Sequence, residues 1–326
     1  MKWTNFFLIL LIIALILTAG CISTEKTTVK VLAAGSLLAP LEDIEAEFES
    51  ANPNVDVTVE GHGSIQCIRQ ITDLNKTFDL ILVADESLIP DMMYRPSPDG
   101  VNFTDDYTSF ARNEMVLAYT DDSAYADEIT SENWIDILAR DNVRKGFSNP
   151  TLDAAGYRTI LMIMLAENYY KDDTLFEKIL GDNLGISVEE DKTGSTVELP
   201  AVLQPKKGSN VVIRDASLFL LSLLESGGID YAFDYKSVAI TQGLHYVTLP
   251  KEINLGYKEY AEYYNKATVY LGFQRFATIG NKRTGLPIVY AGTIPYNAPE
   301  KELAAKLFDY TVSVFKENRA GYPVPF

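Results

Sequence analysis

The stretch VLAAGSLLAP, residues 31–40, places a glycine and a serine between two apolar runs. Residues 28–32, which precede the pair, have the composition of a β-strand. After the pair, apolar residues recur at the spacing of one helix face, at Leu37, Leu41, Ile44 and Phe48. Gly35-Ser36 therefore lies between a strand end and a helix start, where unpaired N–H groups and the helix dipole favour an anion. The alternative is an ordinary serine N-cap.

A second segment repeats this order of strand, glycine-serine turn and helix. Alternating valines in NVDVTVE (54–60) predict a strand, Gly61-His62-Gly63-Ser64 interrupts it, and isoleucines follow at helical spacing. Further strands are predicted at 78–85, 113–119 and 287–291, and further helices at 159–170, 217–226 and 300–315, whereas 181–208 is polar and irregular. This alternation predicts an α/β fold. Two such turns in one parallel sheet would aim two helix starts at one crevice.

The N-terminal segment has the features of an export signal. Residues 1–21, MKWTNFFLILLIIALILTAGC, combine a positive Lys2 with an apolar run and small residues before a cysteine. The Ala-Gly-Cys ending resembles a prokaryotic lipobox, with Thr18 where leucine is usual. Cys21 would then be lipidated, residues 22–29 would form a tether, and the protein would be anchored to the outer face of the cytoplasmic membrane. An uncleaved N-terminal anchor leads to the same location.

The composition restricts the partners of the chain. With 45 acidic and 28 basic residues, its formal net charge is −17, which argues against binding to nucleic acid or to anionic lipid. Because Cys21 belongs to the leader, Cys67 has no cysteine to pair with, and stability must come from a hydrophobic core. The roughly 300 residues that follow the leader suffice for two domains. Local donors would have to hold any anionic ligand.

Residues suited to catalysis are scarce. The chain has 2 histidines and contains no H-x-x-x-H, C-x-x-C, G-x-S-x-G or Walker A pattern. The sequence GHGSIQ at 61–66 has Gln66 where the dinucleotide-binding motif requires its third glycine. We therefore expect a binding protein without a catalytic cofactor. An extracellular enzyme is the alternative from another functional class.

Four motifs, in order along the chain, resemble the archaeal molybdate/tungstate-binding proteins of ABC importers (the tungstate transport protein A type). They are AAGSL (33–37), HGS (62–64), NPTLDAAGYR (149–158) and IDYAFDYKSVA (229–239). The resemblance implies a two-lobed α/β fold of the periplasmic-binding-protein type, in its second topological form, with chain crossovers near Leu117 and Val289. Lobe I would comprise 30–116 plus 290–326, lobe II would comprise 117–289, and the ligand would lie in the cleft between them.

The resemblance also implies the residues that bind the ligand. The oxyanion-binding set would be Gly35, Ser36, Gly63, Ser64 and Tyr235, with the backbone N–H groups of the two turns as donors. Asp153 matches a carboxylate that reaches the metal of the oxyanion. Asp234 would be the second such carboxylate, although it stands where the family generally has glutamate.

Two carboxylates beside a dianion repel it unless the central atom binds them. Tungsten and molybdenum accept an octahedron of oxygens, unlike sulfur or phosphorus, so Asp153 and Asp234 would complete the coordination of the tetraoxo anion. The expected function is capture of tungstate or molybdate by a monomer that delivers it to a membrane permease. A receptor for sulfate, phosphate or a small organic acid on the same fold is the alternative.

Overall fold

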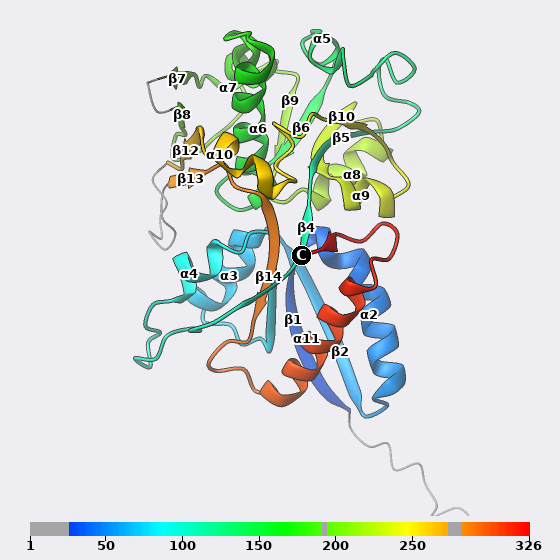
Figure 1. Cartoon of the computed structure of the whole chain (residues 1–326), viewed down its shortest axis with the longest axis vertical. Coiled ribbons are helices and arrows are strands. Elements are labelled where there is room, and N and C mark those ends of the chain that lie inside the picture. The colour runs from blue at the N-terminus through cyan, green and yellow to red at the C-terminus, as the bar shows by residue number, and fades with distance from the viewer. Residues whose placement is uncertain (1–25, 191–193, 273–281) are drawn as a thin grey trace, which may run out of the picture.

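The computed structural model describes residues 26–190, 194–272 and 282–326, which form two lobes stacked along the long axis of the molecule (Figure 1). Both lobes combine helices with β-sheets, which confirms the predicted two-lobed α/β fold. The predicted signal peptide, Cys21 and the first part of the tether lie outside the described residues. Within these residues, no helix has the length and apolarity needed to cross a membrane.

The lobe that contains the first strand is built on a sheet that has six strands in the described residues, in the order β15-β4-β14-β3-β1-β2. β1 is parallel to β2 and β3, whereas β14 is antiparallel to β3 and β4. The strands are β1 (Thr27–Ala34), β2 (Val55–His62), β3 (Leu80–Val83), β4 (Thr108–Asn113), β14 (Ile288–Thr293) and β15 (Val324–Pro325). The helices are α2 (Leu38–Ala51), α3 (Ser64–Thr72), α4 (Leu88–Met93) and α11 (Lys301–Lys316).

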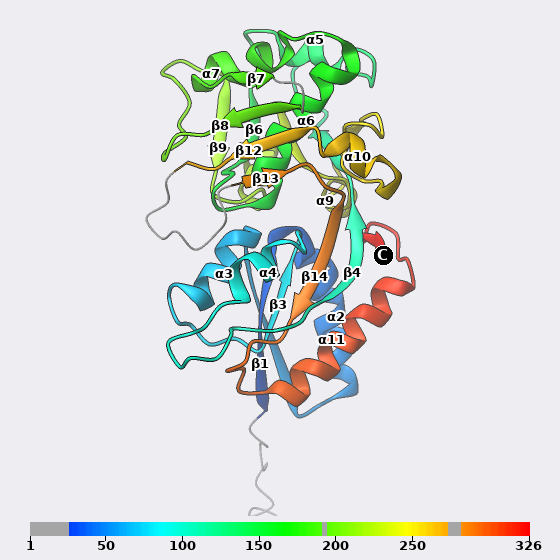
Figure 2. The ribbon, with the colours of Figure 1, turned by 60° about the vertical axis from the view of Figure 1, so that its left-hand side comes forward.

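Two helices of this lobe form where the sequence pattern predicts them. α2 buries Leu41, Ile44 and Phe48, and α3 buries its isoleucines, because residues three and four apart share one helix face. α2 and α11 lie on one side of the sheet and α3 and α4 on the other (Figure 2). Cys67 is a free, buried cysteine on α3, as predicted, and its thiol donates to the carbonyl oxygen of Ala33 at 3.2 Å.

The other lobe contains a sheet of five described strands in the order β11-β5-β10-β6-β9. These strands are β5 (Met115–Tyr119), β6 (Lys145–Ser148), β9 (Val211–Arg214), β10 (Tyr231–Tyr235) and β11 (His245–Thr248). The helices are α5 (Trp134–Leu138), α6 (Ala154–Tyr170), α8 (Leu218–Glu225) and α9 (Lys236–Thr241). α6 is buried over all but its last residues, which explains why its sequence is apolar on every side.

A smaller sheet completes this lobe, with its described strands in the order β13-β12-β8-β7. They are β7 (Val188–Glu190), β8 (Ser195–Glu198), β12 (Ala267–Tyr270) and β13 (Lys282–Thr284), and the short helices α7 (Asp182–Leu184) and α10 (Ala261–Tyr264) lie near them. The prediction of irregular structure over 181–208 was wrong for β7 and β8. Both strands are short, and neighbouring strands rather than their own apolar content hold them in the sheet.

The chain changes sheets at two places. β4 ends at Asn113 in the first sheet and β5 begins at Met115 in the second, so the single strand expected at 113–119 is broken at Glu114. The return lies between Thr284 of β13 and Ile288 of β14. Both crossing segments run side by side between the lobes (Figures 1 and 2). The predicted division into 30–116 plus 290–326 and 117–289 concerns which residues move together, and it stays a prediction.

Candidate functional site

The two glycine-serine turns lie next to each other at one edge of the first sheet. β1 and β2 are parallel neighbours in which Ala34 is paired with His62, so Gly35 and Gly63 follow the paired strand ends directly. A 3-10 turn over Gly35–Leu37 leads into α2, and Gly63 is the N-cap of α3. The carboxyl edge of neighbouring parallel strands is where α/β proteins bind ligands.

Helix starts from the second lobe meet these turns. A Cβ atom placed on Gly63 would lie 2.5 Å from the carbonyl oxygen of Leu152 and 2.7 Å from the Cβ of Asp153, the N-cap of α6. A Cβ atom on Gly35 would lie 2.8 Å from the side chain of Leu218, the first residue of α8. The starts of α2, α3, α6 and α8 therefore converge, two from each lobe, and the positive ends of their dipoles favour an anion.

A cavity of about 70 Å³ lies between the lobes at this convergence. Gly35 and Ser36 line it from one lobe, and Ser217, the N-cap of α8, lines it from the other. Of the predicted site residues, only Gly35 and Ser36 are part of its wall. Gly63, Ser64, Asp153, Asp234 and Tyr235 surround the convergence of helix starts without lining this cavity.

Asp153 is a buried carboxylate that joins two of the helix starts. Its Oδ1 accepts a hydrogen bond from the N–H of Ala155 at 3.4 Å, and its Oδ2 accepts one from the N–H of Ser217 at 2.9 Å. Burial raises the pKa of Asp153, while the N–H of Ser217 opposes the rise. Since both oxygens already accept N–H groups, the carboxylate is held in place by the backbone of α6 and α8.

Asp234, on β10, is fully buried, and its two carboxylate oxygens differ in their hydrogen bonding. Its Oδ1 accepts from the N–H of Tyr235 at 2.7 Å, whereas its Oδ2 has no hydrogen-bond partner among the described residues. Burial raises the pKa of Asp234 to about 7, and the charge of Asp153 adds to the rise, whereas the N–H of Tyr235 and the nearby Ser217 hydroxyl, which makes no hydrogen bond of standard geometry to Oδ2, oppose it. The hydroxyl of Ser148, at the end of β6, makes no hydrogen bond of standard geometry in the described part of the chain, but it lies close enough to Asp153 to lower the pKa of that carboxyl. Unpaired buried oxygens are costly, which makes them candidates for contact with a ligand.

The remaining predicted residues hold the site together. The Ser64 hydroxyl accepts from the N–H of Ala84 at 3.0 Å and thereby fixes the start of α3 against β3. The Tyr235 hydroxyl accepts from the Arg158 guanidinium at 2.8 Å. Its ring packs edge-on against Tyr290, with ring centroids 6.1 Å apart. Ser64 therefore supports the turn from within its own lobe, whereas Tyr235 supports the contact between the lobes.

The sequence did not predict a set of hydrogen bonds and an ion pair that connects the two lobes. The Arg158 guanidinium of α6 donates to the carbonyl oxygen of Ala84 at 2.6 Å and lies 3.4 Å from the carboxylate of Asp85. The Tyr157 hydroxyl also donates to Asp85. Burial alone would raise the pKa of Asp85, but Arg158 and Tyr157 outweigh it and lower the pKa. Both donors lie in the GYR end of the third motif, yet the sequence does not indicate what they contact.

Sequence reasoning also missed a hydrogen-bonded chain that leads from the turn at Ser36 to the crossing segment. The hydroxyls of Ser36 and Tyr290 lie 2.8 Å apart. The Asn113 amide donates to Tyr290 at 3.1 Å and to the Ser237 hydroxyl at 2.7 Å. Ser36 and Ser237 belong to the first and fourth motifs, but Asn113 and Tyr290 belong to none, so only the fold could identify the connection.

The described residues contain no group of three or more histidine, cysteine, aspartate and glutamate side chains that could hold a metal ion. Asp153 and Asp234 are a pair of carboxylates and nothing more. Two carboxylates suit a ligand that brings further oxygens of its own.

Comparison with known proteins identifies the class to which this fold and site belong. The family model described as bacterial extracellular solute-binding protein matches residues 29–313. The chain therefore belongs to this family, whose members bind solutes for transport, and it is a binding protein rather than an enzyme, as predicted.

The relatives are similar over nearly the whole chain. A solute-binding protein of Methanoculleus marisnigri is 38% identical, with 96% of this chain and 90% of the relative covered. The molybdate/tungstate-binding protein WtpA of Thermococcus kodakarensis is 36% identical over 100% of this chain and 94% of its own length. WtpA of Pyrococcus abyssi is 37% identical, with 95% of this chain and 90% of the relative covered. The resemblance to this group that the four motifs indicated is confirmed.

Solved structures share the fold at low sequence identity. The periplasmic molybdate-binding protein of Azotobacter vinelandii superposes with a TM-score of 0.52 at 16% identity, covering 87% of this chain and 92% of that one. The sulfate-binding protein SubI of Mycobacterium tuberculosis superposes with a TM-score of 0.53 at 10% identity, covering 88% and 82%. These likenesses support the two-lobed fold alone.

Proposed function

We propose that this chain captures tungstate or molybdate between its lobes and delivers the anion to an ABC permease in the membrane. The observation that carries the proposal is the fully buried Asp234, whose Oδ2 lacks a partner in the described residues while Asp153 lies nearby as a second buried carboxylate. The similarity to two archaeal proteins named for molybdate and tungstate supports it.

The chemistry of the anion resolves the apparent conflict between two carboxylates and a negative ligand. The N–H groups at the starts of α2 and α3 would take the oxo oxygens, which are the sites of negative charge. Asp153 and Asp234 would bind the hard, oxygen-seeking metal centre itself. Sulfate and phosphate offer no such centre, so the same carboxylates would repel them.

We extend the proposal to the working state of the protein. Lobe I, 30–116 plus 290–326, and lobe II, 117–289, rotate about the crossing segments to enclose the anion. The exported protein acts as a monomer attached to the outer face of the membrane through lipid on Cys21. Mass spectrometry of the N-terminal peptide tests the last point, because an unmodified Cys21 would contradict it.

Calorimetric titration of the purified protein with tungstate, molybdate, sulfate and phosphate tests the ligand. We expect tungstate and molybdate to bind and sulfate and phosphate to bind at least a hundredfold more weakly, about 3 kcal/mol. X-ray absorption of the bound metal provides an independent measurement: an octahedral oxygen shell supports coordination by both carboxylates. Equal affinity for sulfate and tungstate, or a tetrahedral shell, would refute the coordination by Asp153 and Asp234.

A further inference from the structure

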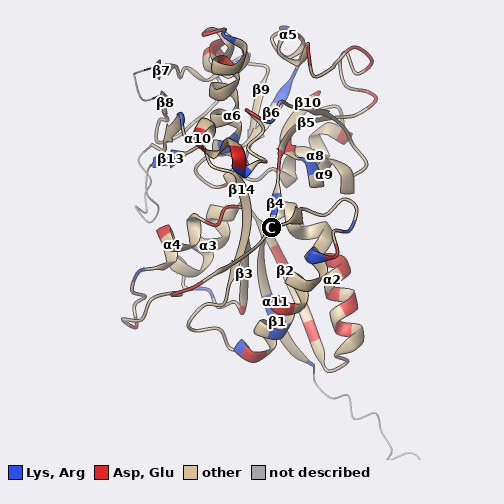
Figure 3. Cartoon of the chain, in the orientation of Figure 1, with Lys and Arg blue, Asp and Glu red and all other residues tan. Residues whose placement is uncertain are grey.

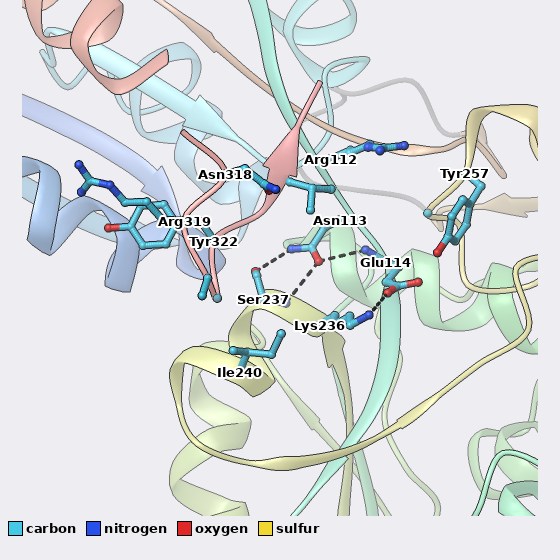
Figure 4. Close-up of a pocket in the computed structure, with 14 residues that line it drawn as sticks. Arg112, Asn113, Glu114, Lys236, Ser237, Ile240, Tyr257, Asn318, Arg319 and Tyr322 are labelled. Atoms are coloured by element: carbon cyan, nitrogen blue, oxygen red, sulfur yellow. Dashed lines mark hydrogen bonds and ion pairs between the residues drawn. The ribbon is translucent and has the colours of Figure 1, made fainter. Parts of the chain in front are cut away.

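A second and larger cavity lies at the crossing between the lobes (Figure 4). Its volume is about 380 Å³, and it shares no lining residue with the small cavity beside Ser36. Arg112 and the C-terminal loop 318–322 contribute to its wall from one lobe. Lys236, Ser237 and Ile240, on α9, contribute from the other. Whatever occupies this cavity therefore contacts both lobes.

The wall of this hinge cavity is positive, although the acidic side chains of the chain are spread over both lobes (Figure 3). It contains three cations, Arg112, Lys236 and Arg319, and one acid, Glu114. Glu114 is already satisfied, since it accepts from Lys236 at 2.6 Å and from the Asn254 amide at 2.7 Å. Within the wall itself cations outnumber acids three to one, in a chain of net charge −17.

Arg112 is the cation that this arrangement leaves available. Arg319 is engaged with Glu47 at 2.7 Å and with Glu317 at 2.8 Å. The exposed Arg112 guanidinium, in contrast, makes no hydrogen bond or ion pair with any described residue. Lys236 uses one of its three donors on Glu114 and keeps the others. Tyr257 and Asn318 add polar groups to the same wall.

We propose that the hinge cavity binds a small polycarboxylate, with one carboxylate on Arg112 and another on Lys236. Cations contributed by two different lobes suit a molecule that carries its charges apart, rather than a compact oxyanion. The planar guanidinium of Arg112 pairs with a carboxylate through two parallel hydrogen bonds. Because Arg112 and Lys236 belong to different lobes, the bound molecule bridges them.

The occupant also reaches the predicted oxyanion turn through hydrogen bonds. Asn113 lies in the cavity wall beside Arg112, and it donates to Tyr290, whose hydroxyl contacts that of Ser36. If the cleft ligand binds this same arrangement of the lobes, a hinge ligand that favours the arrangement strengthens binding in the cleft, and each ligand strengthens binding of the other by the same factor. This coupling rests on the proposed function, whereas binding in the hinge cavity does not.

Calorimetric titration with tricarballylate tests the site directly. This tricarboxylate lacks the hydroxyl through which citrate chelates tungstate, so the two ligands do not react with each other. We expect saturable binding to the wild-type protein and binding about fivefold weaker or more in Arg112→Gln. Arg140→Gln makes the same change of charge near the end of α5, outside the hinge cavity, and should bind like the wild type. No saturable binding, or equal binding by Arg112→Gln, overturns the proposal.

A second titration measures the coupling. With tricarballylate at saturation, tungstate should bind about two- to fivefold more tightly to the wild type, and Arg112→Gln should lose this gain. Weaker or unchanged tungstate binding under saturation overturns the bridging role. If tungstate does not bind at all, the proposed function fails, and the tricarballylate titration still decides whether the hinge cavity is a binding site.

Discussion

Gly63→Ala should weaken ligand binding while leaving each lobe folded. Gly63 has ordinary extended backbone angles, φ −63° and ψ 146°, so alanine fits the backbone without strain. The added Cβ would lie 2.5 Å from the Leu152 carbonyl oxygen and 2.7 Å from the Asp153 Cβ, both in the opposite lobe. Such contacts between backbone and Cβ atoms relax only if the lobes separate.

Overpacking in protein interiors costs about 1–3 kcal/mol of free energy, and we take this range for the added Cβ of Gly63→Ala. This free-energy cost applies only when the lobes are as close as in the present structure, because separating them removes the contact of the added Cβ with Leu152 and Asp153. Affinity for tungstate should therefore fall by about 5- to 150-fold in calorimetry. The unfolding temperature should stay close to that of the wild type.

Gly292→Ala is the matched control. Its Cβ would lie 2.5 Å from the Leu82 side chain and 2.7 Å from the Phe308 ring, all within one lobe. This variant should lower the unfolding temperature and leave affinity unchanged. If Gly63→Ala bound tungstate within twofold of the wild type, the contact between Gly63 and Leu152 would not belong to the ligand-bound state, and the reasoning would fail.

Three further predictions concern the charged groups of the site. Asp153→Asn and Asp234→Asn should each weaken tungstate binding if both carboxylates coordinate the metal, whereas bystander carboxylates predict tighter binding after neutralisation; calorimetry gives the sign. Without ligand, burial raises the pKa of Asp234 from its ordinary value of 3.8 to about 7, so the folded protein holds an extra proton between these pH values. The free energy of unfolding should then fall as pH rises from about 4 to 7, by on the order of 4 kcal/mol from this group, and Asp234→Asn should flatten that part of the denaturation profile. Arg158→Gln leaves Asp85 buried between the lobes without its cation, and we expect affinity to fall at least tenfold, with small-angle scattering showing a larger radius of gyration.

Much of the fold was predictable because the strand-turn-helix pattern is local. The apolar spacing after Gly35-Ser36 and after Gly63-Ser64 gave α2 and α3, and the parallel pairing of β1 and β2 put both turns at one edge. The small sheet was missed because β7 and β8 have three and four residues and gain their order from pairing with other strands.

The partners of the site residues were not predictable. Arg158 reads as an ordinary residue of an apolar helix, and its role depends on Ala84 and Asp85 from the other lobe. Ser217 was expected only as the first residue of a helix, yet its N–H fixes Asp153. Contacts of this kind follow from how two lobes meet, and a single sequence carries no periodic or compositional signal for them.

The meeting of four helix starts has a kinetic consequence. The small cavity beside Ser36 is lined by no charged side chain among the described residues, and the chain as a whole carries a net charge of −17. A divalent anion is therefore repelled at long range and attracted only after it reaches the backbone donors. Dissolved salt shortens the range of the repulsion, with a Debye length of about 10 Å at 0.1 M, and leaves the short contacts nearly intact. The encounter rate of the anion should rise with ionic strength, so that a saline medium speeds uptake rather than slowing it.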